Sequence, residues 1–485
     1  MNIRNLEKGY FLVQTLVFAS IAVFVMSSII SFANTSLNAG RIGIVREKAF
    51  QIAEAGVEYY RWHLAHAPTD YTDGTGGAGP YVHNFYDKDG VLAGTFSLEI
   101  TPPPLGSTLV KIESTGVSVE DPNISRTIVA ELAIPSFAKF AVVTASHMRF
   151  GEGTEIFGPV HSNGGIRMDG IAHNVVTSAL SEYDDPDHSG GNEFGVHTHV
   201  NIPPSTGINN SFRPLEAPPN TVPARPDVFV AGRNMPVPAV DFAGITLDLS
   251  TMRSDAQANG AYFASSGAQG YRIVFRTNDT FDIYRVTSLL SAPYSCNNLA
   301  GQSGWGTWST NNVVLLGNFT MPANGIIFVE DHVWVEGQVD GSRVTVASAR
   351  FPDNPSTRTS ITVNNDLLYT NYDGSDVISL IAQNNINAGM ASADTLRIDA
   401  ALVAQNGRVG RYYYENDCSP YDDRSSITLY GMIASALRYG FAYTDDSGYA
   451  IRNIIYDAHL LYGPPPSFPL TTDEYQIISW KEVVN

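Results

Sequence analysis

Basic residues are scarce in this chain of 485 residues. The sequence has 29 lysines and arginines against 48 aspartates and glutamates, which gives a formal net charge of −19 at pH 7. An excess of negative charge repels nucleic-acid phosphates and anionic lipid headgroups. Lysine and arginine form no cluster anywhere in the sequence. We therefore expect no nucleic-acid partner.

Cysteine is almost absent, and the common sequence patterns of catalysis are missing. Neither Cys296 nor Cys418 lies in a C-x-x-C or Cys/His setting that would indicate metal binding or nucleophilic catalysis. In an exported protein the two can form a disulfide, and the sequence leaves open whether they meet. G-x-S-x-G and P-loop patterns do not occur. We expect no enzyme, no catalytic residue and no cofactor.

Charge and proline are both missing from the N-terminal part of the chain. Residues 10–40 contain no Asp, Glu, Lys or Arg, and no proline precedes Pro68. The almost wholly apolar stretch 10–33 exceeds the roughly 20 residues that a helix needs to cross a bilayer. We predict a helix over 10–66, about 85 Å long if unbroken, with its membrane part at 10–33. Gly40 and Gly43 weaken the middle of this helix.

After residue 40 the same helix becomes amphipathic. Residues at a spacing of three to four fall on one face: Ile42, Val45, Ala49, Ile52, Gly56, Tyr60 and His63. The opposite face carries Glu47, Gln51, Glu54, Glu58 and Arg61. A membrane span that continues into such a stem fits a subunit whose helix leaves the lipid and packs beside neighbouring helices.

Two segments of this N-terminal region resemble a known family. The charged leader 1–9 ends in Lys8-Gly9 directly before the apolar run, and it resembles the class III leader of type IV pilins and pseudopilins. The segment 49–58, AFQIAEAGVE, resembles the signature of the PilX-type minor pilin N-terminal domain. The resemblance implies that a prepilin peptidase cuts after Gly9, leaving Tyr10 as the methylated mature end. An ordinary membrane anchor is the alternative.

One position departs from the pilin pattern. Major pilins carry Glu at the fifth mature position, and this chain has Gln14 there. A carboxylate at that depth needs a partner, which in pilins is the N-terminal amine of a neighbouring subunit. Gln14 cannot neutralise an ammonium group. By resemblance to minor pilins that share this loss, we expect a subunit at the fibre tip; the alternative is a polar residue tolerated in a membrane helix.

The rest of the chain is typical of β-structure. Residues 67–94 are rich in loops, and alternating runs within 95–135 predict strands of a small antiparallel head over 67–136. Residues 380–385 (LIAQNN) recur as 402–407 (LVAQNG), with an echo at 432–435. Such irregular repeats predict a right-handed parallel β-helix over 137–485, with an insertion at 179–310. The alternative is a β-sandwich. The expected fold class is α+β, mainly β.

One segment contains residue types that can bind metals. Five of the eleven histidines lie within residues 161–199, and His197-Thr198-His199 is preceded by a run of acidic residues (Asp184, Asp185, Asp187, Glu193) and His188. These side chains can ligate zinc, but the pattern has no fixed third ligand. We therefore expect a solvated acidic loop and no metal. The oxygen-rich turn 417–423 lacks a calcium-loop pattern.

A carbohydrate-active enzyme is the remaining alternative, because parallel β-helices include such enzymes. Glycosidases need two carboxylates that face one sugar. Asp184-Asp185 and Asp422-Asp423 qualify by composition alone. Fold by itself does not establish function.

The functional expectation is a non-enzymatic minor pilin. It would be inserted in the bacterial inner membrane, trimmed by prepilin peptidase and assembled with other pilin subunits into an extracellular pilus or pseudopilus. At the tip it would prime assembly or contact a glycan, a host or an abiotic surface. Alternatives are a type II secretion pseudopilin and a membrane-anchored carbohydrate-binding or carbohydrate-degrading protein.

Overall fold

The computed structural model describes residues 4–203, 207–242, 249–470 and 474–483. The chain folds into two compact units, which are described separately. Unit 1 consists of Met1–Pro102, Val110–Ala133 and Glu474–Asn485. Unit 2 consists of Pro103–Leu109 and Ile134–Asp473. The expected fold class, α+β and mainly β, is confirmed.

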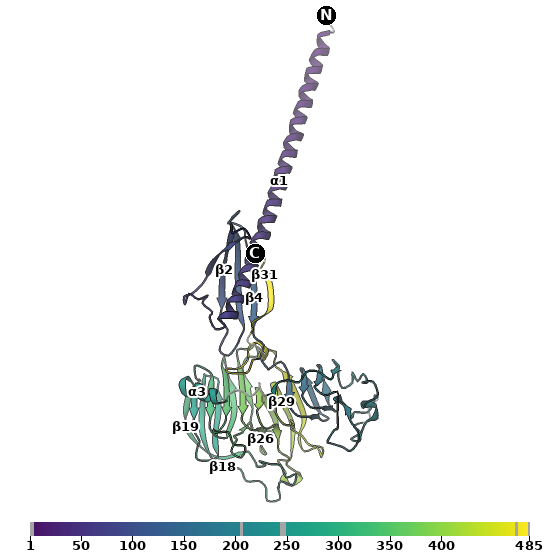
Figure 1. Ribbon diagram of the computed structural model, residues 1–485, viewed down its shortest axis with the longest axis vertical. Coiled ribbons are helices and arrows are strands. Elements are labelled where there is room, and N and C mark those ends of the chain that lie inside the picture. The colour runs from purple at the N-terminus through teal and green to yellow at the C-terminus, as the bar shows by residue number, and fades with distance from the viewer. Residues whose placement is uncertain (1–3, 204–206, 243–248, 471–473, 484–485) are drawn as a thin grey trace. The chain divides into compact units, whose positions relative to one another are not determined.

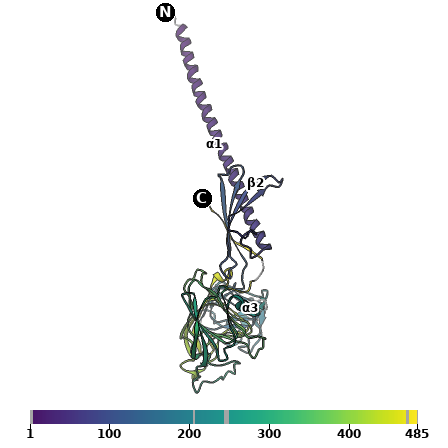
Figure 2. The same ribbon diagram turned by 90° about the vertical axis from the view of Figure 1, so that its left-hand side faces the viewer.

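Unit 1 combines one long helix with an antiparallel sheet. The helix α1 (Arg4–His66) runs without interruption through Gly40 and Gly43 (Figure 1). The sheet has the order β1-β2-β3-β4-β31. Its strands are β1 (Tyr81–Tyr86), β2 (Leu92–Thr101), β3 (Val110–Ser118), β4 (Ser125–Ala133) and β31 (Gln476–Val483). The second half of α1 packs on this sheet (Figure 2).

The last strand of unit 1 was not expected. The sequence indicated that residues 137–485 all belong to one C-terminal region, but β31 pairs antiparallel with β4. The ring of Trp480 in β31 lies edge-on to Phe50 of α1, with the ring centroids 5.8 Å apart. The chain therefore returns to complete the sheet that it left about 340 residues earlier, at the end of β4, a long-range pairing that local sequence patterns do not reveal.

Unit 2 is a stack of coils whose parallel strands form columns. The main column has, in spatial order, β16 (Ala261–Phe263), β20 (Ile326–Val329), β22 (Arg343–Ser348), β25 (Val377–Ala382), β27 (Thr395–Ala404), β29 (Asp423–Ser435), β5 (Val142–Thr144), β8 (Val160–Ser162), β11 (Val176–Ser178) and β15 (Arg233–Asn234). Every neighbouring pair in it is parallel, which is the arrangement of a β-solenoid. A right-handed sense of winding stays a prediction.

Further strands complete the coils. A second column contains β17 (Gly270–Arg276), β21 (Val333–Val339), β24 (Leu367–Tyr369), the starts of β27 and β29, β30 (Gly448–Tyr456), β7 (Thr154–Phe157) and β10 (Ile171–Ala172). Antiparallel β18 (Thr280–Leu289) and β19 (Thr310–Thr320) extend it at one end. The shorter strands are β23 (Ile361–Thr362), β26 (Ile386–Ala388) and β28 (Val409–Arg411), and then β6 (Met148–Phe150), β9 (Ile166–Met168) and β14 (Val196–His197).

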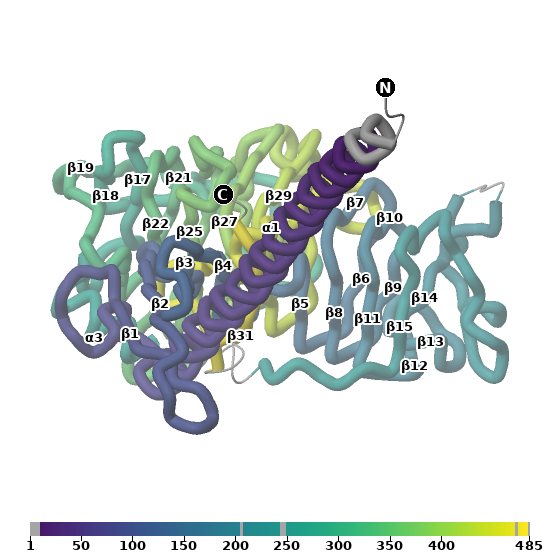
Figure 3. Tube along the Cα trace, turned by 90° about the horizontal axis from the view of Figure 1, so that it is seen from above, coloured from purple at the N-terminus to yellow at the C-terminus, as the bar shows by residue number. Residues whose placement is uncertain are grey.

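The chain does not build this stack from one end to the other. It enters in the middle at β5, builds outward to β15, and then restarts at the far end with β16. The following coils return toward the middle, where β29 pairs with β5 (Figure 3). Helix α3 (Leu249–Asn259) contacts β16 and β20 at the restart. The range 179–310 that we expected for an insertion is therefore too wide, because strands β15 to β19 within it belong to the main sheet.

The near-repeat predicted the stacking of coils correctly in part. Ala382 pairs with Ala404, and both side chains are fully buried, as the repeat of 22 residues implies. The third echo is displaced by one residue, because Ala404 pairs with Ser435 and not with Ala434. At the corner, Asn406 donates a hydrogen bond to the Gln383 carbonyl, so side chains bond the backbone of the adjacent coil.

Candidate functional site

The first half of α1 is apolar and exposed. From Tyr10 to Phe32 its large apolar side chains are 48–76% exposed. Soluble surfaces rarely leave a continuous apolar area of this extent uncovered. The helix is long and apolar enough to cross a membrane. By length and composition, this half suits a lipid or a helix-bundle environment.

The residues expected to direct processing and assembly lie on this helix. Gly9 and Tyr10 both fall within α1. Gln14 follows Tyr10 by about one helical turn, and its side chain is exposed. Cleavage after Gly9 stays a prediction.

The second half of α1 packs on β3 through small residues. A Cβ placed on Gly116 of β3 would lie 2.2 Å from the carbonyl oxygen of Ala49 and 2.4 Å from the amide nitrogen of Ala53. A Cβ on Gly56 of α1 would lie 2.3 Å from Ser114 Oγ. The spacing of Ala49, Ala53 and Gly56 places all three on one helix face. The alanine- and glycine-rich segment therefore has a structural role, since it lets the helix backbone approach the sheet closely.

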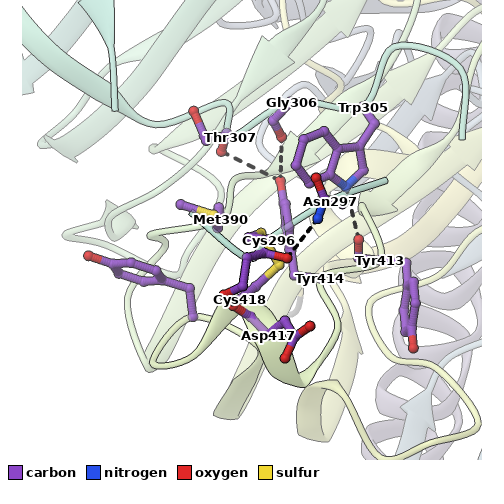
Figure 4. Close-up of a disulfide and its surroundings, with 12 residues drawn as sticks. Cys296, Asn297, Trp305, Gly306, Thr307, Met390, Tyr413, Tyr414, Asp417 and Cys418 are labelled. Atoms are coloured by element: carbon purple, nitrogen blue, oxygen red, sulfur yellow. Dashed lines mark hydrogen bonds between the residues drawn. A yellow bond between two sulfur atoms is a disulfide. The ribbon is translucent and has the colours of Figure 1, made fainter. Parts of the chain in front are cut away.

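The two cysteines meet in unit 2. Cys296 and Cys418 form a disulfide across a sequence separation of 122 residues, with their Cα atoms 4.5 Å apart (Figure 4). Both are buried in a small apolar cluster with Met390 and Tyr414. The Tyr414 hydroxyl donates a hydrogen bond of 2.7 Å to the Gly306 carbonyl, which joins the two loops that the disulfide crosslinks. The Cys296–Cys418 disulfide is compatible with an oxidising compartment.

The histidine- and acid-rich segment 182–199 is not the solvated loop that the sequence indicated. Glu193, His197 and His199 are fully buried, and Asp185 is 2% exposed. The antiparallel pair β12 (Glu182–Tyr183) and β13 (Glu193–Phe194) folds the loop between them back over β14. The acidic and imidazole groups therefore meet inside the protein.

In this cluster three imidazoles surround two carboxylates. Nε2 of His188 lies 2.9 Å from Glu193 Oε2 and 3.6 Å from Asp185 Oδ2. Nε2 of His197 lies 3.2 Å and 3.5 Å from the same two oxygens. Nε2 of His199 lies 3.2 Å from Glu193. We refer to Asp185, His188, Glu193, His197 and His199 as the histidine–carboxylate cluster.

The surroundings favour ionised carboxylates in the cluster. Burial raises the pKa of Asp185, but the nearby His197 imidazole and a hydrogen bond from the Asp187 backbone outweigh it and hold that pKa well below its usual range. The pKa of Glu193 is lowered in the same way, since its contacts with His199 and His197 outweigh burial. Of the two acidic residues that the sequence paired, Asp184 is exposed and Asp185 belongs to the cluster.

The other acidic candidates do not form a comparable site. Asp423 is exposed, and partial desolvation together with the charges of Asp422, Asp445 and Asp446 raises its pKa. Within the described part of the chain, the single group of three or more His, Cys, Asp or Glu side chains with converging ligand atoms is Asp185, His188, Glu193 and His199. The sequence contained a signal for it, the H-x-H pair, but the burial of the loop was not predictable from the pattern.

Comparisons with known proteins give little independent information. No protein-family model matches the chain, and no curated protein matches it. Among solved structures, it is similar to the competence-associated pilin ComZ from Thermus thermophilus. That match has 13% sequence identity and a TM-score of 0.30, and it covers 90% of this chain and 98% of ComZ. At these values the likeness carries no argument, so the function is argued from the residues of this chain.

Proposed function

We propose that the chain is a pilin-like subunit whose helix α1 is held first in a membrane and then in the helical core of a fibre. One observation carries this proposal. The helix is apolar and exposed from Tyr10 onward, and without a break it becomes the stem that packs on the antiparallel sheet of unit 1 after Val45. Relative to leaving it in water, burying each large exposed side chain of its first half is favourable by about 1.5–3 kcal/mol.

The leader supports processing before assembly. In the proposed route a prepilin peptidase cuts between Gly9 and Tyr10 at the inner membrane, and the new N-terminus is methylated. Removal of 1–9 takes away the charged residues that precede the apolar run. The remaining helix can then move from lipid into contact with the helices of other pilin subunits, outside the cell. The stem resembles the PilX-type minor pilins, and we assign the subunit to that class.

Two features support the proposal of a position at the fibre tip. Gln14 cannot form the ion pair that a carboxylate would make with the N-terminus of a neighbouring subunit. Unit 2 spans most of the residues from 134 to 473, which is a large head to repeat along a tightly packed fibre. We therefore place one copy at the end, where unit 2 primes assembly or adheres to a surface such as a glycan. The proposed role is non-enzymatic.

Two alternatives are distinguishable from this role. A pseudopilin of a type II secretion system would be processed in the same way, but its loss would block secretion and leave surface fibres intact. A membrane-anchored carbohydrate-binding or carbohydrate-degrading protein would keep its leader and stay in membranes. The large solenoid of unit 2 is the observation that favours the carbohydrate-binding or carbohydrate-degrading alternative.

The test is mass spectrometry of the N-terminal peptide from sheared surface fibres. We expect a mature end at Tyr10 in the fibre fraction of the wild type and its loss in Gly9→Ala. Gly43→Ala is the matched control, because nothing lies within 4 Å of that position and it is far from the cut. An intact leader, or protein found in membranes alone, would overturn the pilin proposal.

A second experiment addresses the tip. Gln14→Glu restores the carboxylate, so we expect more copies per fibre and labelling along the shaft by immunogold microscopy. The wild type should label fibre ends. Wild-type label along the shaft would contradict the tip position without affecting the processing result.

A further inference from the structure

The proton positions of the three cluster histidines are fixed by their outer hydrogen bonds. Nδ1 of His199 lies 2.7 Å from the Asn209 carbonyl oxygen, and Nδ1 of His197 lies 3.2 Å from the carbonyl of Phe194. Nδ1 of His188 lies 3.3 Å from the Ser189 carbonyl. A carbonyl oxygen only accepts hydrogen bonds, so each Nδ1 carries a proton. In a neutral imidazole the lone pair is then on Nε2.

In the neutral form of these imidazoles, all three Nε2 lone pairs face carboxylate oxygens, which are also acceptors. Two acceptors at about 3 Å repel one another unless a cation lies between them. Among the described residues, His197 Nε2 and Asp185 Oδ2 have no hydrogen-bond partner, although both are buried and aimed into the cluster. A metal ion held by the converging ligand atoms of Asp185, His188, Glu193 and His199 would satisfy the acceptors of these four residues, the unpartnered Asp185 Oδ2 among them. The outer bonds to backbone carbonyls are those that metal-bound histidines typically make.

We propose that the histidine–carboxylate cluster binds one divalent transition-metal ion of the zinc type. Zinc binds imidazole nitrogen and carboxylate oxygen at about 2.0–2.2 Å, and in a tetrahedron these bond lengths separate neighbouring ligand atoms by about 3.3–3.6 Å. Two of the five nitrogen–oxygen distances across the cluster, 3.5 and 3.6 Å, fall within that range, and the other three, 2.9, 3.2 and 3.2 Å, lie below it. Imidazole ligands favour zinc, iron, nickel or copper over calcium or magnesium.

The charged residues around the histidine–carboxylate cluster are compatible with a bound divalent ion. Arg167 is the nearest cation, with Nη1 3.7 Å from Asp185 Oδ2. Its charge is offset by Asp169, which accepts a hydrogen bond of 2.7 Å from Arg167 Nε. Asp169 also accepts a hydrogen bond from the backbone of His199, and Glu193 accepts one from the backbone of Arg213. The two cluster carboxylates therefore remain available to balance a divalent ion.

The position of the cluster indicates what the ion does. His197 belongs to β14, an edge strand of the three-stranded sheet β14-β9-β6. Asp185 and His188 lie in the loop between β12 and β13, which we call the excursion. The strands of this region are two residues long, so they supply few backbone hydrogen bonds. The ion would fasten the excursion and the last coil to the end of the solenoid. An end that is closed in this way is protected from pairing with other chains.

The burial of the ligands favours a structural site. Catalytic zinc sites keep one position open to water or substrate, whereas structural sites are closed by protein ligands. The side chain of His188 is the most exposed of the five, at 5%. The proposed ion is therefore part of the folded head, and this inference does not depend on the fibre role.

The test uses the full-length protein purified in detergent, stripped with a chelator and titrated with Co²⁺ as a spectroscopic probe. We expect one Co²⁺ per chain, with visible absorption typical of a site of four or five ligands, and displacement by Zn²⁺. Glu193→Gln and His199→Asn should each weaken Co²⁺ binding at least tenfold. His173→Asn is the matched control, because His173 also pairs with a carboxylate, Glu155, at 3.1 Å, outside the cluster.

Limited proteolysis supplies a second readout. Zn²⁺ should slow cleavage within 182–213 at least tenfold in the wild type and in His173→Asn, and it should have no effect in Glu193→Gln. A wild-type protein that binds no stoichiometric Co²⁺ or Zn²⁺ at micromolar concentrations would overturn the proposal, whatever the folding of the variants. Equal binding by Glu193→Gln and the wild type would overturn it as well.

Discussion

Replacing Gly116 by alanine adds one methyl group where β3 packs against α1. The φ angle of Gly116 is not positive, so alanine suits its backbone and the effect comes from contact alone. The new Cβ would lie 2.2 Å from the Ala49 carbonyl oxygen and 2.4 Å from the Ala53 nitrogen. Ordinary contact needs about 3.4 Å or more. The obstacles are backbone atoms of the helix, so the helix itself must move away by about 1 Å.

The cost follows from overpacking and from the contacts that the helix loses. Overpacking a tight core typically destabilises by about 1–3 kcal/mol. Here the displaced helix also carries Ile52 and Tyr60, which are buried against the sheet. We expect unit 1 to lose about 2–3 kcal/mol of stability. Such a loss raises the open fraction roughly 30–150-fold.

Hydrogen exchange followed by mass spectrometry measures this opening in the full-length protein. We expect exchange in β3 and in residues 45–64 to accelerate roughly 30–150-fold, while exchange in unit 2 is unchanged. Gly43→Ala is the control, because it has open space around its Cβ and should only strengthen the helix, by about 1 kcal/mol. Wild-type exchange rates in Gly116→Ala would refute the close-packing argument.

Three further predictions concern other contacts. Reducing the Cys296–Cys418 disulfide frees a loop of 122 residues, which by chain entropy lowers stability by up to about 4–5 kcal/mol; the urea midpoint of unit 2 should fall. Arg411 is buried and donates to three carbonyl oxygens, so Arg411→Leu should cost about 3 kcal/mol, measured by thermal unfolding. Hydrogen bonds from Thr72 lower the pKa of Asp70 to about 2. The folded state therefore binds fewer protons than the unfolded state, so the stability that Asp70 contributes is present above about pH 4 and is lost as the pH falls toward 2. In unfolding measurements Asp70→Asn should be less stable than the wild type at pH 6 and equal to it near pH 2.

Much of unit 1 could be predicted from sequence because its signals are local. The apolar run, the absence of proline and the spacing of Val45, Ala49 and Ile52 all depend on neighbours within a few turns. The face that they define is buried as expected, while Ile42 is 41% exposed because the sheet does not extend that far along the helix. Alternation likewise located β2, β3 and β4 correctly.

The histidine–carboxylate cluster could not be predicted in the same way. A run of acidic residues around Asp185 normally faces water, and its burial depends on β12 and β13 folding back over the solenoid end. The partners that fix the histidine protons, the carbonyls of Asn209 and Phe194, are backbone groups that leave no trace in residue type. The sequence therefore indicated which side chains were present and not which of them would meet.

The path of the chain through unit 2 explains why its ends need fastening. Coils from 142–234 and from 261–456 are built separately, and they join where Ile433 of β29 pairs with Val142 of β5. The junction in the middle is thus closed by parallel pairing in both columns, β29 with β5 and β30 with β7, whereas each outer end of the described columns presents a strand edge. At one end the antiparallel strands β18 and β19 cover it. At the other end the strands are too short to do so, and there the histidine–carboxylate cluster joins the excursion, the last coil and the coil of β9. A crosslink at this place has the same effect on the end coil that the disulfide has on the loops of Cys296 and Cys418, because both restrict segments that backbone pairing alone holds weakly.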